Sequence, residues 1–188
     1  LPIWFGFITF TSSGSLISFP SLISPCRIEM MKNLLFISAI LFSSITYSAP
    51  KTSYVMHLNL ANQLATNVMK ACSTTAKPAA VVVLDQGGNV LASQRHETVG
   101  IHNLIAAQRK AFTAYSSKVT TLQFMRNAQK NVDSQNLTSL PELLLLGGGV
   151  PIVYKSQLFG AVGVAGAGGS IQDDQCAQQG IEITLKQI

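Results

Sequence analysis

The sequence is short of charged residues, and acids are the scarcer kind. Of its 188 residues only 8 are Asp or Glu, against 13 Lys and Arg, so the formal net charge is +5. So few carboxylates make a hydrolase with paired acidic groups a poor candidate. The 3 cysteines are too few for a disulfide scaffold. The length suits one domain.

Motifs that define several catalytic and nucleotide sites are also missing. A dinucleotide fingerprint that starts at Gly166 would need glycine where Ile171 stands, and no glycine loop leads directly into the Lys-Ser or Lys-Thr pair of a Walker A motif. There is no nucleophile elbow, no zinc-binding helix motif and no close Cys-His pair. Catalysis is therefore the weaker class of function, and we expect that the protein is not an enzyme.

The N-terminal region has the pattern of a secretory signal peptide. Residues 30–33 include Lys32, residues 34–42 are mostly apolar, and small residues follow as far as Ala49. The apolar run is too short to span a bilayer. We therefore expect a signal peptide at 30–49, cleaved after Ser48, and a periplasmic or secreted protein.

The first 29 residues are rich in Phe, Ile, Ser and Pro and show no helical period. We interpret residues 1–29 as an upstream extension rather than native structure, and a membrane-facing extension is the alternative. Residues 50–188 then form one domain, long enough to bury a core of its own.

Two hairpins and four helices are predicted in that domain. Residues 79–95 and residues 150–165 each contain two apolar, strand-like runs on either side of a short polar turn. Leu60, Leu64 and Val68 form an apolar stripe on a first helix after Asn59. Further helices are expected at 101–115, 120–130 and 171–188, with a loop at 131–141. This order predicts an α+β fold, in which an antiparallel sheet of about five strands is flanked by helices.

Glycines gather around the second hairpin. Gly147, Gly148 and Gly149 precede its first strand, and Gly160 and Gly163 interrupt its second. Glycine weakens a strand, so its repeated use suggests that something packs directly on the backbone. A helix, another subunit or a flat ligand would each satisfy this pattern.

The helix at 101–115 is the candidate functional element. At about 100° per residue, one face contains five large apolar residues that we expect in the core, namely Ile101, Leu104, Ile105, Phe112 and Tyr115. An adjacent stripe contains His102, Ala106, Arg109 and Thr113. That stripe combines an imidazole, a cation and a hydroxyl.

Positive charge is concentrated in the same region. Between residues 95 and 130 there are six cations and one acid, Glu97. A solvated basic face is one explanation. Binding of a small anionic molecule is the other, because Arg holds carboxylates through paired hydrogen bonds. Nucleic acid is not expected as a partner of an exported chain with few aromatic residues.

Cys72 and Cys176 are the cysteines of the predicted mature chain. Export permits a disulfide between them, which would join the first helix to the last. Two separate buried thiols are the alternative.

Several of these motifs together resemble a known family. The segments VVVLDQGGNVLASQR and LLLLGGGVPIVYKSQLFGAVGVAGAGG, with Asp173, Asp174 and Gly180 after them, resemble the GlcG/HbpS-like family of haem-binding proteins and the C-terminal domain of PduO corrinoid adenosyltransferases. The resemblance covers the chain from Leu58 onward. It implies a profilin-like α/β/α arrangement, homo-oligomers, and haem as cofactor.

The resemblance also implies site residues. The segment 109–114 resembles a KAFTA-type helix of the family, whose threonine is implicated at the haem iron, and Thr113 is the matching residue. On chemistry alone His102 is the better iron donor and His96 is next, whereas Ala71 stands where some relatives have a histidine. We expect a haem site near the basic helix and the glycine-rich hairpin, with Thr113 and His102 as iron candidates and the following binding residues: Thr113, Arg109, Lys110, His102, Phe112, Gly148 and Gly149.

Two functions follow as hypotheses. The first is an exported haem-binding protein that stores, buffers or presents haem, with haem breakdown left open. The second is an oligomeric regulatory protein of the same fold that binds no cofactor and docks a partner such as a membrane sensor protein.

Overall fold

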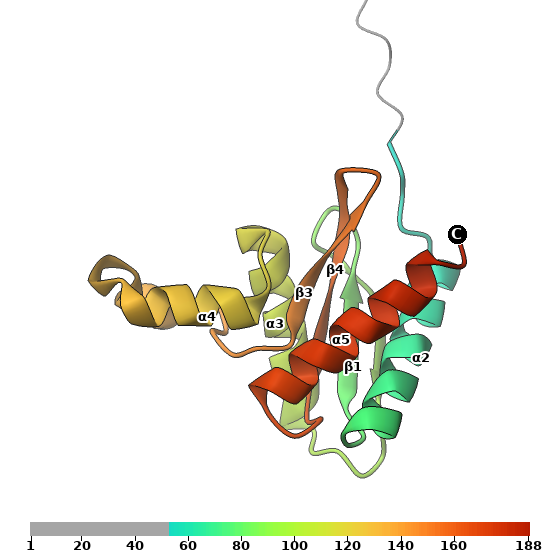
Figure 1. Cartoon of the computed structure of the whole chain (residues 1–188), viewed down its shortest axis with the longest axis horizontal. Helices are drawn as coiled ribbons and strands as arrows, with labels where there is room; N and C mark the ends of the chain where they lie inside the picture. The colour runs from blue at the N-terminus through green and yellow to red at the C-terminus, as the bar shows by residue number, and fades with distance from the viewer. Residues whose placement is uncertain (1–52) are drawn as a thin grey trace, which may run out of the picture. The chain divides into compact units, whose positions relative to one another are not determined.

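The computed structural model describes residues 53–188, so the predictions for 1–29 and for the signal peptide lie outside the described residues. The secondary-structure order follows the predicted one (Figure 1), except that a 3-10 helix lies in the segment 131–141 that was predicted to be a loop. Its elements are α2 (Leu58–Thr75), β1 (Ala80–Leu84), β2 (Val90–Arg95), α3 (His102–Ser117), α4 (Thr121–Lys130), the 3-10 helix η1 (Val132–Ser139), β3 (Gly149–Tyr154), β4 (Gln157–Ala165) and α5 (Ser170–Leu185).

The strands form one antiparallel sheet in the order β2-β1-β4-β3. The predicted α+β class is confirmed, although the described sheet has four strands rather than about five. Gly163 of β4 pairs with Val82 of β1 on one side and with Gly149 of β3 on the other. Two glycines therefore lie next to each other at the point where the edge strand β3 begins.

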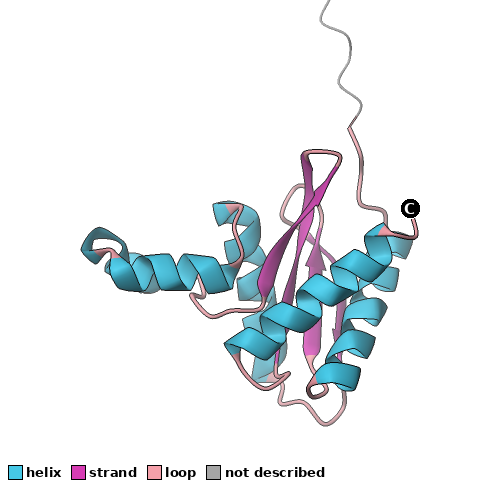
Figure 2. Ribbon diagram, in the orientation of Figure 1, coloured by secondary structure: helices cyan, strands magenta, loops and turns pink. Residues whose placement is uncertain are grey.

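Helices cover both faces of the sheet, as the predicted α/β/α arrangement requires (Figure 2). α2 and α5 lie side by side on one face and α3 lies on the other (Figure 1). In β1, Val81 and Val83 belong to the core beneath α2 and α5, while Val82 and Leu84 belong to the core beneath α3. This explains why β1 is apolar along its whole length, because both of its faces are buried. None of the helices described at 53–188 is both long and apolar enough to cross a membrane.

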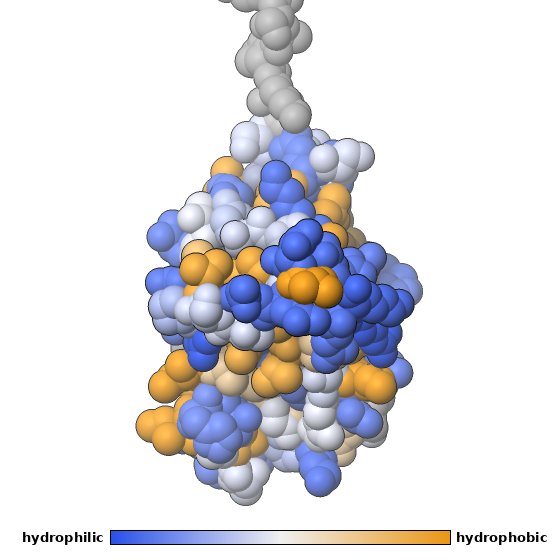
Figure 3. All heavy atoms as spheres, turned by 90° about the vertical axis from the view of Figure 1, so that its left-hand side faces the viewer, coloured by the Kyte–Doolittle hydropathy of each residue, from blue (hydrophilic) through white to orange (hydrophobic). Residues whose placement is uncertain are grey.

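α4 leads away from the sheet and packs mainly against η1 (Figure 1). Its first residue follows Thr120, whose side chain accepts a hydrogen bond from the backbone N–H of Gln123 and so caps the helix. The surface on this side of the protein is mainly hydrophilic, with separate apolar areas (Figure 3).

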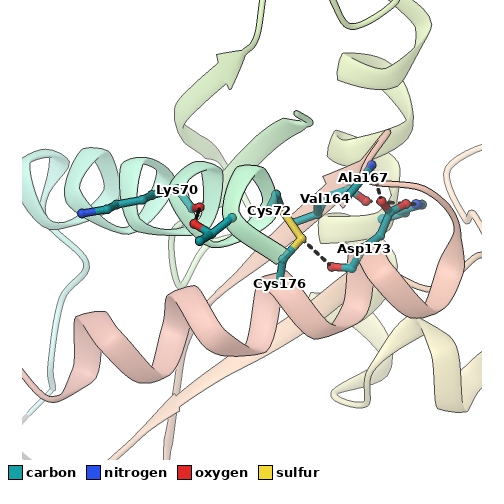
Figure 4. The surroundings of a disulfide bond; sticks show 8 residues. Lys70, Cys72, Val164, Ala167, Asp173 and Cys176 are labelled. Carbon is teal, nitrogen blue, oxygen red and sulfur yellow. Dashed lines mark hydrogen bonds and ion pairs between the residues drawn. A yellow bond between two sulfur atoms is a disulfide. The ribbon is translucent and has the colours of Figure 1, made fainter. Parts of the chain in front are cut away.

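A disulfide joins α2 to α5, the two helices that lie side by side on one face of the sheet. Cys72 lies near the end of α2 and Cys176 near the start of α5, and their sulfur atoms are bonded (Figure 4). The predicted disulfide is therefore present in the structure, rather than two separate thiols. It closes a loop with a sequence separation of 104 residues.

Candidate functional site

The inner face of α3 consists of small and polar residues, which reverses the prediction for this helix. Ile101, Ile105 and Phe112 were expected in the core, but they are 76%, 62% and 38% exposed. The expectation was wrong for these three, while Leu104 and Tyr115 are partly buried against the core. The buried residues of α3 are Ala107, Lys110, Ala111, Thr113 and Ala114.

Glycines in the sheet account for this choice of face. A Cβ atom at Gly163 would overlap the carbonyl oxygen of Ala107 and lie 2.6 Å from the backbone nitrogen of Ala111. A Cβ atom at Gly149 would overlap the carbonyl oxygen of Lys110. The helix backbone thus lies directly on the sheet backbone, and only small side chains fit between them. Large apolar side chains are left on the outer face.

The glycines predicted to contact a ligand, Gly148 and Gly149, are instead packed against other parts of the protein. Gly149 lies beneath α3, and a Cβ atom at Gly148 would lie 2.5 Å from the carbonyl oxygen of Val164 and 2.6 Å from Cβ of Asp173. Both glycines are buried. Of the explanations left open by the sequence, helix-on-sheet packing is the one that the structure shows for Gly149, whereas Gly148 packs against the β4 backbone and the Asp173 side chain.

Lys110 has an internal partner instead of a free ammonium group. Its Nζ lies 2.7 Å from Oδ2 of Asp173 and donates to the carbonyl oxygen of Val164 at 2.9 Å. The second carboxylate oxygen of Asp173 accepts from the backbone N–H of Ala167 at 2.7 Å (Figure 4). This buried ion pair joins α3 to the start of α5, so the geometry gives no support to a ligand role for Lys110.

Arg109 and Thr113 hold the segment that precedes β3. Nη2 of Arg109 donates to the carbonyl oxygen of Leu143 at 2.7 Å, and the backbone N–H of Leu144 donates to the Thr113 hydroxyl at 2.8 Å. The Thr113 hydroxyl itself donates to the carbonyl oxygen of Arg109 at 2.8 Å. Thr113 is fully buried, so the hydroxyl predicted to reach iron is enclosed by the 143–144 segment.

The outer face of α3 presents a different set of groups. His102, Ile105, Arg109 and Phe112 follow one another at intervals of three or four residues, which places them in one row along the helix. A surface pocket of 270 Å³ opens beside this row. It is lined by Leu84, Gly88, Ile105, Gln108, Arg109, Phe112 and Glu142.

Contacts with the first hairpin position this pocket. The Tyr115 hydroxyl donates to the carbonyl oxygen of Gln86 at 2.6 Å, and the Tyr115 ring packs against Gly88. The turn is therefore held against α3 at the edge of the pocket. Most of the lining is apolar, and the charged groups among its lining residues are the guanidinium of Arg109 and the carboxylate of Glu142.

The structure thus brings together part of the predicted site. Arg109 and Phe112 share the pocket, His102 lies on the same helical row, and Thr113, Lys110, Gly148 and Gly149 lie on the buried side. Ile105, Gln108 and Glu142 were missed as lining residues. The small stripe formed by Ala107, Ala111 and Ala114 was a signal that could have identified the true outer face.

The fold and the site together define a small α/β/α protein. A mostly apolar pocket opens beside the outer row of α3, and Arg109 is the cation among its lining residues. The chain belongs to the family described as "Haem degrading protein HbpS-like", which matches residues 56–182. This confirms the resemblance found in the sequence.

Individual relatives agree with that membership. The chain is 27% identical over 131 residues to the "Uncharacterized 15.0 kDa protein in dhaT-dhaS intergenic region" of Citrobacter freundii, covering 63% of this chain and 91% of that protein. The crystal structure of HbpS aligns with a TM-score of 0.64 and 28% identity over 74% of this chain and 98% of HbpS. PduOC, solved as a haem complex, has the same fold, with a TM-score of 0.59 and 20% identity over 69% of this chain and 94% of PduOC.

Proposed function

We propose that this protein is an exported haem-binding protein that stores, buffers or presents haem, and that haem lies on the outer face of α3. Membership of the HbpS-like family and the haem complex of PduOC support a haem-related role. The main structural observation in its favour is the row of α3 in which the cation Arg109 stands between the exposed apolar residues Ile105 and Phe112.

The chemistry of this row fits haem. Haem offers a flat apolar macrocycle, two propionates and an iron that takes an axial donor such as histidine. Ile105 would pack against the macrocycle, and Arg109 would pair with a propionate. His102 would be the axial donor. It lies seven residues before Arg109, about 10 Å along the helix axis.

One chain offers only part of such a site. The pocket of 270 Å³ is slightly below the range of roughly 300–1,000 Å³ that is usual for sites that enclose a small molecule. A macrocycle on this surface would leave its other face uncovered. We therefore propose that a second copy of the chain covers that face, so that haem is held between subunits of a homo-oligomer.

A spectral titration with hemin tests the proposal. We expect a shifted Soret band that saturates at a fixed stoichiometry, and we expect His102→Ala to change the band. His57→Ala is the matched control, because His57 is also exposed but lies before α2. No Soret shift with hemin, or equal effects of the two histidine substitutions, would contradict the proposal.

Glu142 provides a second test at the same pocket. Its carboxylate shares the pocket with Arg109 and would repel a propionate. Glu142→Gln should therefore tighten hemin binding, and the gain should shrink at high ionic strength because exposed charges are screened. Unchanged or weaker binding would argue against a propionate at Arg109.

Export belongs to the same proposal and has its own test. The pattern at residues 30–49 supports a cleaved signal peptide. Mass spectrometry of the protein recovered outside the cytoplasm should give a chain that begins at Ala49. A cytoplasmic protein that retains residues 30–49 would contradict export.

The second candidate is a regulatory protein that binds no cofactor. The exposure of Ile101, Ile105 and Phe112 favours it, because an apolar row on a helix also suits a protein partner. A colourless preparation that shows no hemin binding and captures a defined partner through this row would favour the second candidate. Loss of capture in Phe112→Asp would identify the row as the contact.

A further inference from the structure

Three aromatic rings form a corner at the tip of the second hairpin, on a different part of the protein from the α3 pocket. Tyr54 precedes α2, Tyr154 ends β3 and Phe159 lies in β4. The Tyr54 and Tyr154 rings are perpendicular, with centroids 5.2 Å apart. The Phe159 ring is tilted by 42° to that of Tyr154, with centroids 5.8 Å apart.

A cation already lies in this corner. Nζ of Lys155 is 4.6 Å from the centre of the Tyr54 ring and 5.1 Å from the centre of the Tyr154 ring. It also donates a hydrogen bond to the Tyr54 hydroxyl at 3.2 Å. The face of an aromatic ring is negative, so a positive charge that lies over the Tyr54 and Tyr154 rings is attracted to them.

The backbone that presents Lys155 adopts an unfavourable conformation. Lys155 and Ser156 have φ angles of 45° and 61°. Two-residue hairpin turns of this kind strongly favour Asn-Gly or similar pairs, because other residues are disfavoured at positive φ. Conformations of this kind persist where the surrounding structure holds them, and they are concentrated at ligand contacts and switch regions.

An apolar pocket lies beside the same rings. Its volume is 390 Å³, and Tyr54, Val55, Leu60, Tyr154 and Phe159 contribute to its lining. This volume is within the usual range for a small-molecule site of roughly 300–1,000 Å³. Ser53, His57 and Ile188 complete the lining, and none of these described residues has an acidic side chain. A cation here would be recognised mainly by ring faces and apolar contact.

We propose that this aromatic corner binds a small quaternary ammonium ion, and that the ammonium group of Lys155 occupies the corner until such an ion displaces it. A quaternary ammonium ion has no N–H donor, so it needs no hydrogen-bond acceptor at the site. Its methyl groups match the apolar pocket, and its charge matches the ring faces. Lys155 acts as an internal competitor, so removal of its charge should strengthen binding.

An NMR titration of the whole protein with choline chloride tests this site, with sodium chloride at equal ionic strength as the reference. We expect saturable shifts in the ring signals of Tyr54 and Tyr154. Lys155→Gln, which keeps a long polar side chain without the charge, should bind choline about two- to fivefold more tightly, in line with an exposed cation–π contact. Tyr54→Leu should abolish the saturable shifts, whereas Tyr54→Phe should retain them because it keeps the ring face.

Several results would overturn the proposal. Equal shifts with sodium chloride would show a general effect of salt. Lys155→Gln binding choline no more tightly than the unaltered protein would show that Lys155 does not compete. Unchanged binding in Tyr54→Leu would show that the ring does not contact the ion, and loss of binding in a folded Tyr54→Phe would show that the hydroxyl is recognised instead of the face.

Discussion

Removal of one partner of the buried ion pair between Lys110 and Asp173 should be among the most destabilising single substitutions in this fold. Both residues are almost fully enclosed, at 4% and 3% exposure, and the charged atoms are 2.7 Å apart. The pair connects α3 with the start of α5, two elements on opposite faces of the sheet. Asp173→Asn removes the negative charge but keeps an oxygen that can accept from the Ala167 N–H.

The expected loss follows from the charge that remains. Removing one partner of a buried ion pair typically costs about 3–5 kcal/mol, because the other charge stays buried without compensation. Lys110 would retain its hydrogen bond to the Val164 carbonyl oxygen, so we expect the low end, about 3 kcal/mol. In a domain of this size that corresponds to a fall in Tm on the order of 10 °C.

Urea denaturation with the disulfide intact measures this loss, and a double-mutant cycle isolates the pair. The double variant Lys110→Met with Asp173→Leu should lose much less stability than the sum of the single losses, because no unpaired charge remains. The exposed pair of Lys186 and Glu182 at 2.6 Å is the matched control. Its removal should have little effect. Additive losses at Lys110 and Asp173, or an Asp173→Asn loss below about 1 kcal/mol, would refute this account.

Three further predictions concern packing, burial and the disulfide. Gly163→Ala should destabilise the protein by about 1–3 kcal/mol, because the added methyl group overlaps the Ala107 carbonyl oxygen; an unchanged Tm would show that α3 can move away from the sheet. Burial raises the pKa of Asp174 above its ordinary value of 3.8, so the folded state binds more protons between the two pKa values and stability falls as the pH rises through that window. Asp174→Asn should therefore stabilise the protein at pH 7, and this gain in stability should disappear below about pH 3.8. Urea denaturation at pH 7 and at a pH below that value measures the gain, and an equal gain at the two pH values would contradict the prediction. Reduction of the Cys72–Cys176 bond should lower the free energy of unfolding by about 4 kcal/mol, from the entropy of the loop that it closes, and equal denaturation midpoints with and without reductant would exclude that effect.

The secondary structure was predictable because its signals are local. Short apolar runs around Asp85 to Gly88 and around Lys155 to Gln157 mark both hairpins, and the observed strand ends differ from the predicted ones by about one residue. Helix starts were less certain, as α2 begins at Leu58 rather than after Asn59.

The orientation of α3 was not predictable from helical periodicity alone. That rule assumes that the largest apolar side chains face the core. Here the sheet provides glycines at positions 149 and 163, so the helix fits with Ala107, Ala111 and Ala114 inward and with Ile105 and Phe112 outward. The alanine stripe hints at this face, but the contacts that fix it join segments between 39 and 56 residues apart, which helical periodicity does not contain.

The hydrogen-bond and ion-pair partners of the predicted binding residues could not be found from the sequence for the same reason. Lys110 meets Asp173 across 63 residues, and Arg109 meets the Leu143 carbonyl oxygen across 34. The spacing along α3 predicted a single stripe with an imidazole, a cation and a hydroxyl, and this was wrong, because Thr113 is fully buried whereas His102 is exposed. The spacing could not show that the hydroxyl faces inward, whereas the imidazole faces outward.

That difference leads to opposite predictions for Thr113 and His102, the two candidate iron ligands. Thr113→Val removes the acceptor of the Leu144 N–H, so it should lower stability by about 1–3 kcal/mol. It should also speed hydrogen exchange at Leu144, because that amide is left without its partner. The Soret band of the hemin complex should stay unchanged, since the hydroxyl is enclosed. His102→Ala should change the band and leave stability nearly unaltered, because the side chain is exposed. If Thr113→Val alone altered the band, the 143–144 segment would have to leave α3 when haem binds, and the threonine would be the donor.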